Sequence, residues 1–118
     1  MKLISQKDYK KLLANGKRQR QAQEQGKNLD FRPVVRLFTP DAQATWLLTE
    51  IDPEAPLIAF GLCDLGMGYP ELGYVSLEEI SSVRGRLGLP VERDLYFLAD
   101  KTLGAYRREA EKKGRITP

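Results

Sequence analysis

The fold is decided by residues 45–63, which read TWLLTEIDPEAPLIAFGLC. Thr45–Glu50 and Leu57–Cys63 are runs rich in aliphatic, aromatic and β-branched residues, which is typical of strands. Between them, Asp52-Pro53 favours a turn, because proline fixes φ and aspartate bonds to nearby backbone amides. The second run is apolar at nearly every position, which indicates burial on both faces. We therefore predict two strands, the second of them central in a sheet.

The rest of the chain supplies three more strands and three helices. Short apolar runs bounded by Gly, Pro or Asp predict strands at 34–38, 72–75 and 95–98. Apolar residues at helical spacing predict helices over 6–14, 77–83 and 101–113. Their expected N-caps are Ser5, Ser76 and Asp100. This order predicts an α+β fold: a mostly antiparallel sheet of about five strands with N-terminal, middle and C-terminal helices.

The N-terminal region is less apolar than the rest. Asn15-Gly16 is typical of the end of a helix. In residues 17–28 the only apolar side chain is Ala22, so this stretch can bury little surface. It is therefore either an exposed extension of the helix or a linker.

Length and composition limit the chemistry. A chain of 118 residues suits one domain, with a basic N-terminal helix and possible linker over 1–30 and a core over 31–118. There is no His, and Cys63 is the only Cys, which excludes histidine metal sites, Cys–His dyads and a disulfide within the chain. We expect no metal and no cofactor, and we expect Cys63 and Trp46 to be core residues.

The sequence also bounds the location of the protein. No apolar run approaches the roughly 18 residues of a membrane span, and the first residues contain no signal-peptide pattern. A single thiol fits a reducing compartment. We therefore expect a soluble cytoplasmic protein without a membrane partner.

Charge is strongly segregated along the chain. Residues 1–36 contain 10 Lys/Arg and 3 Asp/Glu, residues 37–100 contain 3 and 11, and residues 101–118 contain 6 and 2. The segments therefore carry net charges of +7, −8 and +4, which give the overall +3. The chain has an acidic middle and basic ends.

Two functional interpretations of this charge compete with plain solvation of surface helices and loops. Clustered cations capture phosphates by releasing counterions, so the basic ends are candidate nucleic-acid or partner contacts. The residues are Lys17, Arg18, Arg20, Arg107 and Arg108. An acidic surface complements a basic partner. Its candidate residues are Glu50, Asp52, Glu54, Asp64, Glu71, Glu78 and Glu79.

A third charged group precedes the last predicted strand. Glu92 and Asp94 would share one face of an extended chain, with Arg93 on the other. A carboxylate pair could serve a metal-dependent nuclease. The favoured interpretation is structural, with Arg84, Glu92, Arg93 and Asp94 taking part in ion pairs.

Five blocks of sequence carry a resemblance to a known family. They are Val35–Pro40, Trp46–Glu50, Phe60–Gly66, Pro70–Leu77 and Gly88–Phe97. In this order they resemble the domain-of-unknown-function family DUF2958. The resemblance covers residues 34–97 and leaves out the basic N-terminal region.

The resemblance implies a function without implying site residues. Similar small proteins look like passengers of phages and plasmids in bacteria, and some act as anti-CRISPR inhibitors of Cas9-type effectors. The expected function is therefore non-enzymatic: inhibition of a Cas9-type protein or its ribonucleoprotein by binding, either through the acidic middle or with the basic ends on nucleic acid. The alternatives are a nucleic-acid-binding accessory factor of a mobile element and, less favoured, a metal-dependent nuclease.

Overall fold

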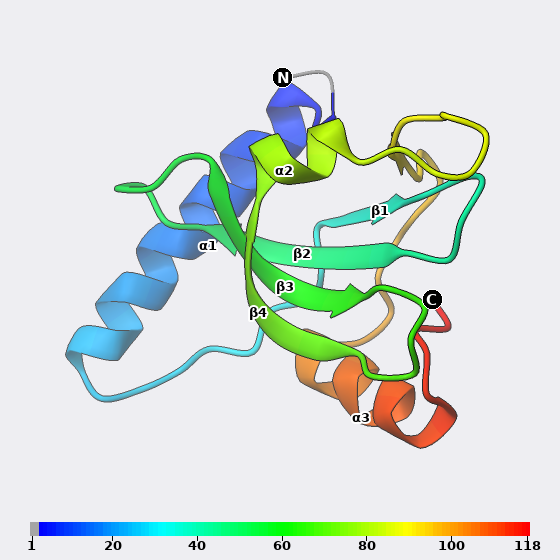
Figure 1. The fold of residues 1–118 in the computed structure, drawn as a ribbon. Helices are drawn as coiled ribbons and strands as arrows, with labels where there is room; N and C mark the ends of the chain where they lie inside the picture. Colours follow the sequence, from blue (N-terminus) through cyan, green and yellow to red (C-terminus); the bar gives the residue numbers. More distant parts are fainter. Residues whose placement is uncertain (1–2) are drawn as a thin grey trace.

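The computed structural model describes residues 3–118 (Figure 1). The helices of these residues are α1 (Gln6–Glu24), α2 (Leu77–Ser82) and α3 (Leu103–Lys113). The strands are β1 (Val35–Phe38), β2 (Thr45–Ile51), β3 (Ile58–Asp64), β4 (Glu71–Ser76) and β5 (Glu92–Arg93). All neighbouring strands are antiparallel, in the order β4-β3-β2-β1-β5. The predicted α+β fold is confirmed.

The middle of the sheet is formed by the apolar runs on either side of Asp52-Pro53. β2 pairs with β3 in a register that places Trp46 opposite Cys63 and Leu47 opposite Leu62. Trp46 is buried, and Cys63 packs against the same core cluster, as predicted. β3 lies inside the sheet, between β2 and β4. Its Ala59 belongs to the core cluster that contains Trp46 and its Leu62 to the cluster that contains Leu103, so its apolar side chains are covered on both faces, as its sequence predicted.

A β-bulge changes the alternation within β2. The register with β3 shifts between Leu48 and Glu50, which leaves Thr49 as the extra residue. As a result Leu48 and Ile51 both join the core cluster that contains Trp46. Glu50 lies opposite Phe60, so its side chain points to the other face of the sheet.

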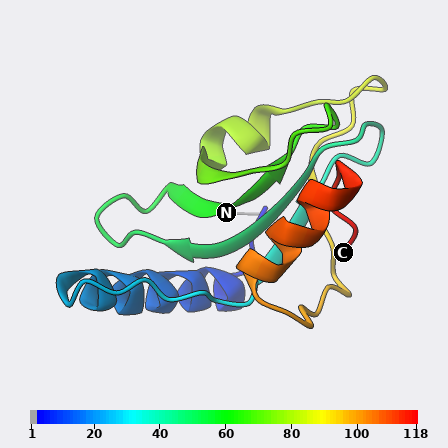
Figure 2. The ribbon, with the colours of Figure 1, turned by 90° about the horizontal axis from the view of Figure 1, so that it is seen from below.

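Each face of the sheet carries its own core. Figure 1 shows the sheet between α2 above and α3 below, and Figure 2 shows α1 and α3 from the side. One cluster joins α1 and α2 to the sheet; its members include Leu12, Leu37, Trp46, Leu48, Leu77 and Ile80. The other joins α3 and the C-terminal segment to the opposite face; its members include Leu47, Leu62, Leu103, Tyr106, Ala110 and Ile116.

The prediction that the first helix ends at Asn15-Gly16 is wrong. Ser5 caps α1 as expected, and its Oγ accepts a hydrogen bond from Asp8 N (3.1 Å). The helix then continues to Glu24, so the 17–24 part is the helical extension rather than the linker. Asn15 is buried and its Nδ2 donates to the carbonyl of Thr49 (2.9 Å), the bulged residue. Asn15 and Gly16 are both buried where α1 packs on the sheet, and they do not end the helix.

Two predictions near the C-terminus also need correction. Residues 95–98 form a loop, because the last strand is the two-residue β5, which pairs with the outer edge of β1. α3 begins at Leu103, and its N-cap is Thr102, whose side chain accepts from Ala105 N (3.4 Å). Asp100 instead accepts a hydrogen bond from the hydroxyl of Tyr106 (3.0 Å).

Two other helix boundaries match the prediction. Ser76 caps α2, and its Oγ accepts from Glu79 N (3.2 Å). Gly114 ends α3 in the left-handed conformation that glycine adopts most readily. None of the helices described is long and apolar enough to cross a membrane.

Candidate interaction surfaces

The seven predicted acidic residues do not form one surface, because two of them are buried. Asp64, the last residue of β3, is only 4% exposed. Its Oδ1 accepts from Gly66 N (2.8 Å) and its Oδ2 accepts from Ile116 N (2.9 Å). Asp64 therefore holds the C-terminal segment at the end of β3 and offers no carboxylate to a partner.

Glu50 is the second buried acid, with an exposed fraction of 9%. Burial raises the pKa of its carboxyl, while hydrogen bonds from Thr49 and Gln19 act in the opposite direction. Thr49 Oγ1 donates to Glu50 Oε1 at 3.2 Å. Within residues 3–118 no Lys or Arg forms an ion pair with Glu50. This carboxylate lines a cavity rather than the outer surface.

Two more predicted acids are held by a predicted basic residue. Arg20 on α1 contacts Asp52 (NH2 to Oδ1, 2.6 Å) and Glu54 (NH1 to Oε1, 2.8 Å). The hydrogen bond that Arg20 donates to Glu54 is the main cause that raises the pKa of Arg20, opposed by partial desolvation. Acidic and basic residues that were assigned to separate surfaces therefore neutralise each other.

The last three predicted acids are exposed but not contiguous. Glu71 is the first residue of β4, whereas Glu78 and Glu79 follow its last residue, in the first turn of α2. A six-residue strand spans roughly 17–20 Å, which separates Glu71 from the other two. The acids of α2 also stabilise the positive N-terminal end of that helix.

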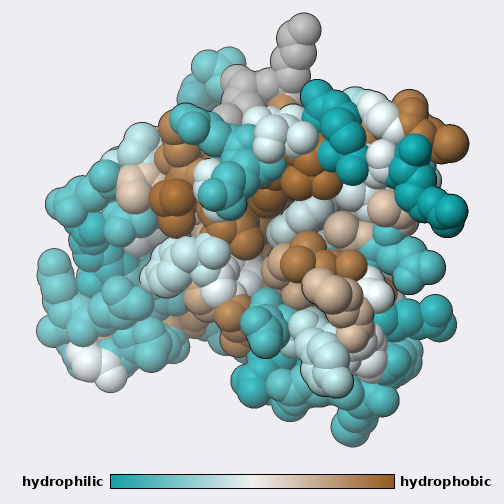
Figure 3. Space-filling view, viewed as in Figure 1, coloured by the Kyte–Doolittle hydropathy of each residue, from teal (hydrophilic) through white to brown (hydrophobic). Residues whose placement is uncertain are grey.

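The basic residues of α1 do gather on one surface. Because the helix runs through Gly16, Lys17 and Arg18 share its exposed face with Lys7, Lys10 and Lys11. At 100° per residue these five cations, here called the basic stripe, fall within about one third of the circumference. No residue of the basic stripe takes part in an ion pair in the described part of the chain. In Figure 3, hydrophilic side chains cover the left side of the molecule, where α1 lies.

Three members of the basic stripe were not among the predicted residues. Lys7, Lys10 and Lys11 lie on the same helix face as Lys17 and Arg18 only when the helix is not interrupted. The five cations stand at i, i+3, i+4, i+10 and i+11, which share one face of a continuous helix. A helix that ended at Asn15-Gly16 would not have joined them.

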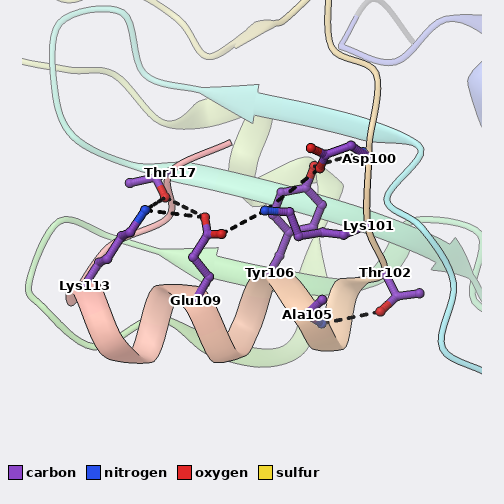
Figure 4. A network of polar contacts seen from close by, with 8 residues as sticks. All are labelled: Asp100, Lys101, Thr102, Ala105, Tyr106, Glu109, Lys113 and Thr117. Carbon is purple, nitrogen blue, oxygen red and sulfur yellow. Dashed lines mark hydrogen bonds and ion pairs between the residues drawn. The ribbon is translucent and has the colours of Figure 1, made fainter.

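The basic residues of α3 are less available. Arg107 is paired with Glu111 (2.9 Å), whereas Arg108 is exposed and forms no ion pair within residues 3–118. The opposite side of α3 carries a polar network around Glu109 (Figure 4), which Lys101 (2.8 Å) and Thr117 (2.7 Å) contact. The hydrogen bonds from Lys101 and Thr117 lower the pKa of Glu109 to about 2. This network ties both flanking segments to α3.

The predicted ion-pair group before the last strand has a different partner. Asp94 Oδ2 contacts Arg36 NH1 (3.0 Å) on the neighbouring strand β1, which lies beside it in the sheet. Arg84, Glu92 and Arg93 form no ion pair within residues 3–118, and the Arg84 guanidinium donates to the carbonyls of Ser81 and Val83 instead. The pairing of β5 with β1, rather than closeness in sequence, therefore determines that Arg36 is the partner of Asp94.

The same carboxylate shapes the loop that follows it. Asp94 Oδ1 accepts from the backbone of Tyr96 (3.0 Å), so both its oxygens have partners. In the described part of the chain, no three Asp, Glu or Cys side chains lie close enough together to hold a metal ion.

The loop over 95–98 presents apolar side chains to solvent. Leu95, Tyr96 and Leu98 are 72%, 93% and 89% exposed. Phe97 points the other way, packs on the ring of Tyr106 (centroids 6.5 Å apart) and joins the α3 core cluster. The loop is thus fixed at its start and in its middle while three large side chains remain uncovered. We call these three residues the apolar loop.

Comparison with known proteins agrees with the family resemblance and extends it. A family model described as "Protein of unknown function (DUF2958)" matches residues 3–117. The match includes α1 and α3, so the family resemblance extends beyond residues 34–97 at both ends. No curated protein and no solved structure matches the chain. On the strength of a match over nearly its whole length, the chain belongs to the DUF2958 family.

Proposed function

We propose that this protein acts by binding another macromolecule in equimolar amounts, and that its partner is a Cas9-type nuclease loaded with guide RNA in a bacterial cytoplasm. The proposal includes an origin in a phage, plasmid or other mobile element. The observation that carries the binding part is the apolar loop. The choice of partner rests on the family resemblance together with the segregated charge.

The apolar loop has the properties of a protein-binding surface. Large apolar side chains that are exposed together usually mark interaction sites, and tyrosine is enriched among residues that dominate binding energy. Burying one leucine side chain is worth roughly 1.5–3 kcal/mol. Because Asp94 and Phe97 already order the loop, little conformational entropy would be lost when a partner binds it.

The charge distribution favours one of the two expected binding modes. In the first mode the acidic middle imitates nucleic acid, but Glu50 and Asp64 are buried and Arg20 holds Asp52 and Glu54. In the second mode the body docks on protein while basic residues contact guide RNA or target DNA. The basic stripe supports this second mode, since its cations can bind phosphates and release their counterions.

The test is capture of a guide-loaded Cas9-type nuclease by the tagged protein, together with its effect on DNA cleavage. We expect a complex of one to one and a loss of cleavage at equimolar protein. A variant with Leu95, Tyr96 and Leu98 all changed to Ser should bind at least tenfold more weakly, because several such anchors are worth at least about 1.4 kcal/mol together.

The matched control is Leu87→Ser, which removes an equally exposed leucine from the 84–90 hairpin. It should bind like the unchanged protein. Capture of the nuclease that is equally strong for the triple variant contradicts a role for the apolar loop. Absence of any complex, with and without target DNA, contradicts the proposed partner.

The basic stripe also favours a second candidate, a nucleic-acid-binding accessory factor of a mobile element. Such a protein would shift DNA or RNA by itself, with affinity that falls steeply as salt rises. If the proposed function is right, this protein instead binds the nuclease together with its guide RNA. A gel-shift titration without the nuclease therefore separates the two.

A further inference from the structure

A cavity of about 320 Å³ lies between three elements that are distant in sequence. Its walls are the C-terminal half of α1, the segment over 28–31, and the face of the sheet that α3 covers in part. In Figure 3 the surface is notched between the α1 side and the α3 side of the molecule. The volume is within the range of small-ligand sites.

The charged groups of this cavity are all acidic. Glu50 and Asp30 line it, and no Lys or Arg does so in the part of the chain that the structure describes. Asp30 is already used, because its Oδ1 accepts from Gly104 N at the start of α3 (3.0 Å). The carboxylate of Glu50 can still pair with a cation. The side chains that donate to it, Thr49 and Gln19, are neutral, and within residues 3–118 no Lys or Arg forms an ion pair with it.

A buried carboxylate without a cation is costly to the fold. Desolvation disfavours its charged form, and an opposite charge brought alongside removes that cost. The β-bulge at Thr49 is what turns Glu50 toward this cavity, instead of toward the α1 and α2 core. The site is therefore built by the backbone of β2 and is not a chance exposure of an acid.

Aromatic rings complete the wall beside Glu50. Glu50 lies opposite Phe60, and Phe60 lies opposite Tyr74, so the three side chains form a row across β2, β3 and β4. The rings of Phe60 and Tyr74 pack edge to face with centroids 5.1 Å apart. A carboxylate next to aromatic rings is the environment that organic cations prefer, because the ring face attracts a cation and the carboxylate pairs with it.

The geometry points to this cavity as a binding site for an organic cation that carries a guanidinium group, with Glu50 as its counter-ion and Phe60 and Tyr74 as its wall. Such a group belongs to a small free guanidine, or to the end of an Arg side chain of a peptide. The site shares no residue with the apolar loop or the basic stripe. It goes beyond the proposed function and does not depend on it.

The experiment is a titration of the whole protein followed by amide NMR spectra. The probes are butylguanidinium, an acetylated and amidated Gly-Arg-Gly peptide, and the corresponding Gly-citrulline-Gly peptide, which has the same shape without charge. We expect shifts centred on Phe60, Tyr74 and Glu50 with at least one cationic probe and none with the citrulline peptide. Butylguanidinium alone indicates a free ligand, whereas the arginine peptide alone indicates a side chain of a partner.

Two variants make the result specific. Glu50→Gln keeps the shape of the side chain and should weaken binding of the cationic probes at least tenfold. The matched control Glu79→Gln removes an exposed acid of α2 that does not line the cavity, and it should bind as the unchanged protein does. Equal binding of charged and uncharged probes, equal binding by Glu50→Gln, or no shift with either cation at millimolar concentration would overturn the inference.

Discussion

At the scale of single residues, Gly16 shows how one position sets the distance between a helix and a strand. A Cβ at this position would overlap the backbone carbonyl of Ile51, so α1 can cross the end of β2 only where a side chain is missing. The neighbouring Asn15 then donates to the carbonyl of the bulged residue, Thr49. In an ordinary exposed helix, alanine in place of glycine would stabilise by about 1 kcal/mol.

Gly16→Ala should therefore lower the free energy of unfolding, whereas helix propensity alone would raise it. We expect a loss of roughly 1–3 kcal/mol in the free energy of unfolding, because the helix has to move away from the sheet. Chemical denaturation measures the change. The control Gln21→Ala, on the exposed side of the same helix, should be neutral or slightly stabilising. A stabilised Gly16→Ala variant would contradict the close crossing.

Trp46 belongs to the larger core cluster, which joins the sheet to α1 and α2. Trp46→Ala should lower the free energy of unfolding by roughly 3–5 kcal/mol, since it removes buried area and leaves a cavity. Tyr69→Ala is the control, because Tyr69 is exposed in the β3–β4 connection and should change stability by less than about 0.5 kcal/mol. A near-neutral Trp46→Ala would show that its ring is not part of the core.

At the scale of elements, the Glu109 network makes α3 sensitive to acid. The pKa of Glu109 is about 2 in the folded protein against an ordinary 4.5, so the ionised form favours folding. This contribution is complete above pH 4.5 and is lost as pH falls from there through 2. We expect the free energy of unfolding to fall with acid over this interval.

The Glu109→Gln variant should lose that part of the pH dependence. Denaturation curves at several pH values between about 2 and 5 check the prediction. The control is Glu71→Gln, an exposed acid on β4 outside the network, whose curve should keep the dependence of the unchanged protein. Identical pH profiles for Glu109→Gln and the unchanged protein would contradict the role of the network.

The second prediction for an element concerns the basic stripe of α1. If it binds phosphates of duplex DNA, changing Lys10, Lys17 and Arg18 to Gln leaves up to three phosphates without a cation. The slope of log affinity against log salt should then decrease in magnitude by roughly 0.9 for each of these phosphates. Titrations of bound DNA at several salt concentrations measure it.

The matched triple variant changes Arg107, Arg108 and Lys112 of α3 to Gln. Because Arg107 is already paired with Glu111, this variant should change the slope less than the α1 variant. A larger change of the slope for the α3 variant than for the α1 variant would place the nucleic-acid site on α3 instead of α1. Both variants should remain folded, since the residues they change lie on the surface of their helices.

At the scale of the whole molecule, Asp64 joins the end of β3 to the last residues of the chain. Its two oxygens accept backbone hydrogen bonds from Gly66 and Ile116, and Ile116 adds its side chain to the α3 cluster. Asp64→Asn leaves one buried backbone donor without its charged acceptor. We expect a loss of roughly 1–3 kcal/mol in the free energy of unfolding.

Amide hydrogen exchange locates the effect of Asp64→Asn. The Ile116 amide should lose protection first, and the amides of β2 should follow only with the global loss of stability. Glu71→Gln, in the next strand, provides the control with unchanged protection of Ile116. If Ile116 stays protected in Asp64→Asn, the C-terminal segment is held by its apolar contacts alone.

Much of the fold could be predicted because its causes are local. The continuous apolar runs of Thr45–Glu50 and Leu57–Cys63 favour a buried pair of strands wherever the chain places them. Ser5 and Ser76 cap helices through amides three residues away, so those helix starts need no tertiary information. The same holds for Gly114, which ends α3 through its own backbone conformation.

The candidate site was predicted far less well, because its residues depend on neighbours that are distant in sequence. Asp64 and Asp52 looked alike as candidates for an acidic surface, but Asp64 is buried and accepts from Ile116 N, and Asp52 is paired with Arg20. Asp94 was expected in an ion pair, but only the fold makes Arg36 its partner. The strand predicted over 95–98 had suitable residues, but the chain turns away from β1 after Asp94, whose side-chain Oδ1 accepts from Tyr96 N and whose carbonyl accepts from Phe97 N.

The order of residues was enough to specify the three helices in outline, the first four strands, and that β3 is covered on both faces. Folding in three dimensions was needed to decide which charges stay free, that α1 continues past Asn15-Gly16, and that Glu50 turns into a cavity. The physical reason is the separation along the chain over which each interaction acts. Propensity and capping act over a few residues, whereas burial, ion pairing and strand register act between groups that meet only after the chain has folded.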